Sequence, residues 1–98
     1  MQTTTLGATG RTVSVAGLGC GGSSKIGMSR GMSEAQSVRL VRSAFEEGVT
    51  FIDTAEAYGT EAIVGAALKE LGDRDGITVS TKSRYRGPAG LMRAAEVI

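Results

Sequence analysis

The sequence predicts an α/β fold in which parallel strands alternate with helices and curve towards a barrel. Helical spacing of apolar residues alternates at short intervals with β-prone runs, which is typical of parallel strands joined by crossover helices. The run at 77–82 places Ile77, Val79 and Thr81 on one side and small, polar or charged residues on the other. An open sheet between two helical layers favours apolar residues on both faces. We therefore favour a barrel with a polar interior over an open sheet.

The chain is expected to begin with a β-hairpin. Residues 3–6 and 12–15 are β-prone and flank a Gly-Ala-Thr-Gly turn at 7–10. Residues 16–19 are expected to form a brief strand. Residues 20–32 are rich in glycine and serine and lack periodicity, so we expect an irregular loop there.

The first helix is expected to begin after Ser33, because Ser33 and Gln36 form a capping-box pattern. Apolar residues at helical spacing follow, and Gly48 stands where a left-handed residue would end the helix. The next residues, 49–53, form a short apolar run. They are expected to be the second strand.

The second helix is expected to begin at Thr60, whose side chain can cap it. An apolar stripe follows, and Gly72 ends the helix. A third strand is expected at 77–82 and a loop at 83–90. A third helix is expected at 91–98.

Composition limits the classes of function. The 98 residues allow one small domain, residues 1–98, and the net charge of +1 gives no electrostatic case for binding nucleic acid or an anionic membrane. Cys20 is the single cysteine, which excludes an internal disulfide and fits a reducing compartment. No apolar run approaches the roughly 20 residues that cross a bilayer, and the N-terminus lacks the blocks of a secretion signal. We therefore expect a cytoplasmic protein without membrane partners. Because histidine is absent, a Ser-His or Cys-His nucleophile is excluded, and no metal site is expected.

Two ionisable residues end neighbouring strands on the predicted interior side. Asp53 shares a strand face with Val49 and Phe51, and Lys82 lies on the polar face of the third strand. Adjacent parallel strands lie about 4.8 Å apart, so the two side chains can meet at the carboxyl-terminal rim, where barrel active sites lie. Tyr58 follows Asp53 closely enough for its loop to fold back over that rim.

These three residues can form a proton-donating group. An ammonium beside a phenol stabilises the phenolate, so Tyr58 becomes a better proton donor to a carbonyl oxygen. Asp53 would hold Lys82 in place and keep it charged. Taken singly, each residue is more often a cap, a solvated charge or a packing residue. Their joint placement predicts the catalytic role.

A glycine motif suggests a second interpretation. Gly17, Gly19 and Gly22 match the G-x-G-x-x-G pattern of dinucleotide-binding Rossmann folds. That pattern needs a helix opening on its last glycine, whereas about ten irregular residues precede Ser33 here. We keep a Rossmann-type site as the minor alternative. Cys20, within the motif, is expected to be a small loop residue, since no histidine can activate it.

The chain also resembles a known family. The resemblance is carried by Gly17-Leu18-Gly19, by the run Glu47-Gly48-Val49-Thr50-Phe51-Ile52-Asp53-Thr54-Ala55-Glu56-Ala57-Tyr58-Gly59, and by Thr81-Lys82. Together these motifs resemble the N-terminal part of an aldo/keto reductase, and the resemblance covers nearly the whole chain. It implies a partial (β/α)8 TIM barrel, with an N-terminal β-hairpin plus about two and a half βα units.

The resemblance also implies NADPH-dependent reduction of small aldehydes and ketones. Three catalytic residues carry over, namely Asp53, Tyr58 and Lys82. The implied cofactor contacts are Gly19, Cys20, Gly21 and Asp53. The family's fourth catalytic residue, a histidine ending the fourth strand, and its main cofactor-phosphate contacts lie beyond the region that the chain matches.

We therefore expect an N-terminal fragment of a reductase barrel, inactive by itself. The alternative is a non-catalytic truncated product or a fragment that associates with another subunit. Such a fragment would leave strand edges open, so we expect it to self-associate through those edges.

Overall fold

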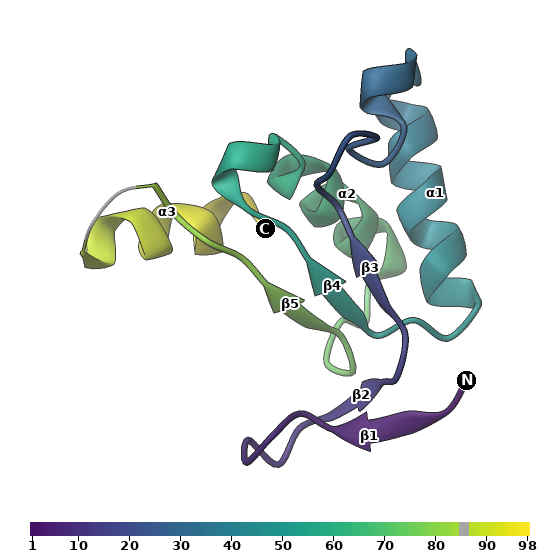
Figure 1. Ribbon diagram of the computed structural model, residues 1–98, viewed down its shortest axis with the longest axis vertical. Coiled ribbons are helices and arrows are strands. Elements are labelled where there is room, and N and C mark those ends of the chain that lie inside the picture. Colours follow the sequence, from purple (N-terminus) through teal and green to yellow (C-terminus); the bar gives the residue numbers. More distant parts are fainter. Residues whose placement is uncertain (85–86) are drawn as a thin grey trace.

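A computed structural model describes residues 1–84 and 87–98. Its elements, shown in Figure 1, are β1 (Thr3–Thr5), β2 (Thr12–Ser14), β3 (Gly17–Gly19), η1 (Met28–Arg30), α1 (Glu34–Glu46), β4 (Phe51–Asp53), η2 (Glu56–Tyr58), α2 (Glu61–Leu71), β5 (Thr78–Ser80) and α3 (Pro88–Val97). Strands β1 and β2 pair antiparallel, and β3, β4 and β5 form a parallel sheet in that order. The predicted α/β class, the hairpin and the parallel strands are confirmed. Tyr85 and Arg86, which fall in the loop expected at 83–90, lie outside the described residues.

The hairpin lies at the amino-terminal end of the parallel strands (Figure 1). Gly7 and Gly10 adopt positive φ angles in its turn, as the turn sequence predicts. A reciprocal pair of hydrogen bonds fixes the hairpin to the sheet. The Ser14 amide donates to Thr50 Oγ1 at 2.8 Å, and the Thr50 amide donates to Ser14 Oγ at 2.9 Å. The hairpin therefore lies away from the loops at the opposite, carboxyl-terminal end of the strands.

Helix α1 begins and ends where the sequence predicts. The Gln36 amide donates to Ser33 Oγ, and the Ser33 amide donates to Gln36 Oε1, so both halves of the capping box form. At the other end Gly48 has a φ of 94°, and its amide donates to the Phe45 carbonyl. These local contacts satisfy backbone groups that a helix leaves unpaired at its ends.

The two faces of the parallel sheet differ. Helices α1 and α2 cover one face (Figure 1), and Ile52 of β4 lies fully buried in the core on that side. Ile77 and Val79 pack against the same core, which confirms the predicted apolar side of the third strand. Phe51 and Asp53 alternate with Ile52 and are only partly buried. The face away from the helices therefore carries both the Phe51 ring and the Asp53 carboxylate.

The strands are shorter than expected, with β5 at Thr78–Ser80 in place of 77–82, and other elements differ as well. Helix α3 begins at Pro88, before the expected start at residue 91, because proline has a fixed φ that suits the first turn of a helix. The loop expected at 20–32 contains the short helix η1. Val49 precedes β4 and packs against the core, so the strand alternation does not extend to it.

The predicted cap of α2 is wrong. Thr60 has helical ψ and its side chain makes no cap hydrogen bond. Its hydroxyl is buried and is used elsewhere, as described below.

Candidate active site

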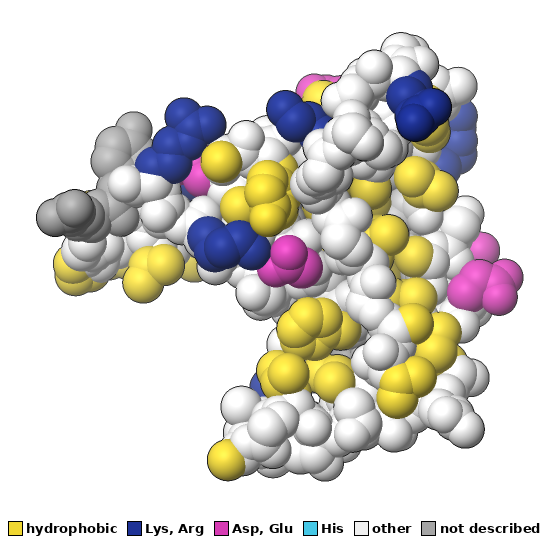
Figure 2. Space-filling model, in the orientation of Figure 1, with side chains coloured by type: hydrophobic (Ala, Val, Ile, Leu, Met, Phe, Trp, Pro, Cys, Tyr) yellow, Lys and Arg dark blue, Asp and Glu magenta, His cyan; other side chains and the backbone are white. Residues whose placement is uncertain are grey.

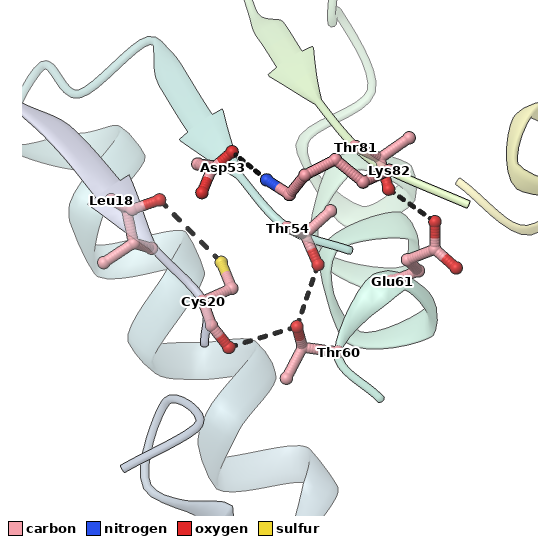
Figure 3. Close-up of polar contacts among 8 residues, drawn as sticks. All are labelled: Leu18, Cys20, Asp53, Thr54, Thr60, Glu61, Thr81 and Lys82. Atoms are coloured by element: carbon pink, nitrogen blue, oxygen red, sulfur yellow. Dashed lines mark hydrogen bonds and ion pairs between the residues drawn. The ribbon is translucent and has the colours of Figure 1, made fainter. Parts of the chain in front are cut away.

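The structure brings Asp53 and Lys82 together at the carboxyl-terminal end of the sheet. Lys82 Nζ donates to Asp53 Oδ1 at 2.8 Å (Figure 3). The backbone ladder between β4 and β5 continues past both strands, because the Glu56 amide donates to the Lys82 carbonyl at 2.9 Å. Figure 2 shows an acidic and a basic side chain in contact near the middle of the open face. The structure therefore contains the predicted contact between Asp53 and Lys82 at the rim.

This ion pair orients the ammonium more than it stabilises the fold. The two side chains are 53% exposed for Lys82 and 41% for Asp53, so water screens their attraction. The hydrogen bond that Lys82 donates to Asp53 raises the pKa of Lys82, and the charge of Asp53 and the Tyr58 phenol add to that effect. Lys82 therefore stays an ammonium at neutral pH and points along a fixed direction.

Tyr58 reaches the ammonium from the one-turn helix η2. The amide of Tyr58 donates to the Ala55 carbonyl, and Gly59 ends the turn with a φ of 73°. Lys82 Nζ lies 5.3 Å from the centroid of the Tyr58 ring, within the range of cation–π attraction. Asp53, Lys82 and Tyr58 thus lie together at one rim, which sequence spacing predicted.

Gly21 lets the Tyr58 ring lie close to the loop after β3. A Cβ atom at position 21 would lie 2.8 Å from Tyr58 Cζ, closer than real Cβ contacts come. The ring therefore rests on the Gly21 backbone, in space that any side chain at this position would fill. The sequence pointed to Gly21 only as an implied cofactor contact and did not predict this packing.

Cys20 is unsuited to be a nucleophile. Its side chain is fully buried, and burial, together with the charge of Asp53, raises the pKa of its thiol to about 11. The thiol is therefore protonated at neutral pH. The Cys20 amide donates to the Asp53 carbonyl at 2.8 Å, which holds the loop against β4. Contacts of Gly19, Cys20, Gly21 and Asp53 with a cofactor stay predictions.

A chain of buried hydroxyl groups supports this loop from beneath (Figure 3). Thr60 Oγ1 donates to the Cys20 carbonyl at 3.1 Å and lies 2.8 Å from Thr54 Oγ1. A hydroxyl has one proton, so Thr54 must be the donor to Thr60. The sequence did not indicate this network, because its members are up to 40 positions apart.

The described residues, 1–84 and 87–98, contain neither a candidate metal cluster nor a candidate membrane span. Within them no three cysteine, aspartate or glutamate side chains gather as a group that could hold a metal ion. No helix in the same ranges has the length and apolar character needed to cross a bilayer.

Comparisons with known proteins agree on one family. The sequence model of the Aldo/keto reductase family matches residues 17–97. Aldo-keto reductase YhdN of Bacillus subtilis (strain 168) is 42% identical over 89 residues, which are 85% of this chain and 26% of that protein. The chain spans about a quarter of the length of the curated relatives that it matches.

Solved structures give the same family. The thermostable aldo-keto reductase Tm1743, solved with the inhibitor epalrestat, superposes with a TM-score of 0.74 at 32% identity. The match covers 99% of this chain and 37% of that one. The Bombyx mori aldo-keto reductase AKR2E4, solved with NADP, superposes with a TM-score of 0.73 at 26% identity, over 92% of this chain and 32% of that one.

Proposed function

This chain belongs to the aldo/keto reductase family, and from that premise we propose that it carries the N-terminal part of a site that reduces aldehydes and ketones with NADPH. The hairpin and the three parallel strands with their helices make up part of the (β/α)8 barrel of such enzymes. The observation that carries the proposal is the Asp53–Lys82 ion pair beside the Tyr58 ring. We further propose a cytoplasmic location, with which the unpaired Cys20 is consistent.

Three residues of the chain would handle the proton. Tyr58 holds it on the phenol oxygen and donates it to the carbonyl oxygen of the substrate as negative charge develops there. The Lys82 ammonium stabilises the phenolate that results, and Asp53 keeps that ammonium in place. NADPH, when bound, supplies the hydride that the carbonyl carbon receives.

The loop after β3 is compatible with a flat cofactor ring. A Cβ at Gly19 would meet nothing within 4 Å, so the surface beside Asp53 is open at this point. Gly19 and Gly21 have no side chains, and Cys20 turns its thiol into the protein. We propose that Gly19, Cys20, Gly21 and Asp53 form the part of the NADPH site that this chain contributes.

Titration of the purified chain with NADPH, followed by cofactor fluorescence, tests the proposal. A saturable change is the result that the proposal requires, with an affinity below that of a complete barrel, because this chain would supply only the contacts at Gly19, Cys20, Gly21 and Asp53. Gly19→Val should weaken binding by filling that surface. The matched change Gly76→Val should leave binding unchanged, because Gly76 is equally open but lies in the turn at the other end of β5.

A second candidate function is a non-catalytic fragment that associates with another copy or subunit. It is favoured by β5, which within the described residues pairs with β4 alone. An apolar groove of about 340 Å³ lies beside that free edge, between β5 and α3, and includes Val79, Leu91 and Ala94. If the titration with NADPH gives no saturable signal, the result favours this candidate over the reductase.

A further inference from the structure

Glu61 is a buried carboxylate that the proposed proton transfer does not use. It lies in the first turn of α2 and is only 5% exposed. Its two oxygens bind different elements. Thr81 Oγ1 donates to Oε2 at 2.6 Å, and Arg93 Nη2 from α3 donates to Oε1 at 2.7 Å. A buried charge that is fully partnered in this way holds its partners in a fixed arrangement.

The partners of Glu61 lead to both Lys82 and Tyr58. Thr81 precedes Lys82 directly, and Figure 3 shows the Thr81–Glu61 bond next to the Lys82–Asp53 bond. Arg93 Nη2 also lies 3.6 Å from Glu56 Oε2, at the start of the short helix that carries Tyr58. One carboxylate therefore joins α2, α3, the end of β5 and, through Arg93, η2.

The hydrogen bonds outweigh the cost of burying this carboxylate. Burial alone would raise the pKa of Glu61, but the hydrogen bonds from Thr81 and Arg93 and the charge of Arg93 bring the pKa below its ordinary value. Glu61 is therefore ionised at neutral pH. Because the folded-state pKa is lowered, the stabilisation is present above the unfolded-state pKa and is lost as pH falls through the folded-state value.

We propose that Glu61, Thr81 and Arg93 form a positioning cluster that fixes Lys82 against Asp53 and Tyr58. Successive side chains of an extended segment point to opposite faces, so holding Thr81 against the helices directs Lys82 to the open face. The catalytic meaning of the cluster rests on the proposed reductase function. The effect of the cluster on the position of Lys82 does not depend on that function. This effect can be measured without cofactor or substrate.

The test is the NMR titration of the Lys82 side chain in the purified chain, with Lys25 and Lys69 as internal references. Thr81→Val keeps the shape of the side chain but removes its hydroxyl. We expect the pKa of Lys82 to fall towards its ordinary value in this variant, because the ammonium is no longer held against Asp53. Thr81→Ser retains the hydroxyl and should restore the parent titration. An unchanged Lys82 titration in folded Thr81→Val overturns the proposal.

A second variant covers the case in which Thr81→Val does not fold. Glu61→Gln removes the charge that holds Arg93, and we expect it also to lower the pKa of Lys82. Glu70→Gln is the matched control, because Glu70 pairs with Arg42 on the exposed side of α1 and α2 at 3.0 Å. A Lys82 titration that is the same in Glu61→Gln as in the parent overturns the cluster. If the parent chain does not bind NADPH but the pKa of Lys82 still falls in these variants, the result counts against the reductase function and not against the positioning cluster.

Discussion

Tyr58→Phe is expected to abolish carbonyl reduction while NADPH binding stays largely intact. The expectation applies to any form of the protein containing this chain that reduces a carbonyl substrate. The change removes the phenol proton but keeps the ring that rests on Gly21 and faces Lys82. Loss of a general acid lowers turnover by about 10²- to 10⁴-fold. Consumption of NADPH in the presence of an aldehyde, followed by absorbance, measures the effect.

The control for this variant is the NADPH titration described above. Binding within a few-fold of the parent would show that the site is intact and that only proton donation is lost. Turnover retained at the parent level by Tyr58→Phe would refute the role assigned to Tyr58. It would leave the fold and the family unaffected.

The stability of the purified chain is expected to increase with its concentration. Within the described residues one edge of β5 is unpaired, and exposed Leu91 of α3 lines the groove beside it, so a second copy would cover both. If folding is coupled to association, a hundredfold rise in concentration adds about 2.7 kcal/mol to the free energy of unfolding. Denaturation at several concentrations, together with sedimentation, measures this dependence.

Two substitutions locate the associating surface. Leu91→Glu puts a charge into the groove beside β5 and should remove the concentration dependence. Leu40→Glu is the matched control, because Leu40 is 42% exposed on α1 and Leu91 is 58% exposed on α3, and only Leu91 lines the groove. A cooperative unfolding transition of a monomer, with the same midpoint at every concentration, would contradict self-association.

The sequence predicted those features that depend on local chemistry. The capping box of Ser33 and Gln36 spans one turn of helix and needs no other part of the chain to form. The meeting of Asp53 and Lys82 is more distant, but it follows from strand order and from the alternation of side chains along parallel strands. Regular backbone geometry therefore sufficed for the main contact of the site.

Contacts that depend on side-chain packing between elements were missed. Thr60 was expected to cap α2, yet its hydroxyl donates to the carbonyl of Cys20, 40 positions away. Glu61 lies in the first turn of α2, where a carboxylate suits the helix dipole. Its bond to Arg93, 32 positions later, depends on where α3 packs. Local sequence patterns do not predict contacts between residues this far apart in the chain. The hydrogen bonds of Thr60 and Glu61 could therefore be identified only in the folded structure.

Asp53, Tyr58 and Lys82 lie together at one rim, at the carboxyl-terminal ends of β4 and β5. Nuclear Overhauser effects from the Tyr58 ring protons test this arrangement most directly in solution. We expect contacts from this ring to the α-protons of Gly21 and to the Cε protons of Lys82. A Tyr58 ring that contacts neither residue, or that contacts only residues at the hairpin end of the sheet, would contradict this arrangement.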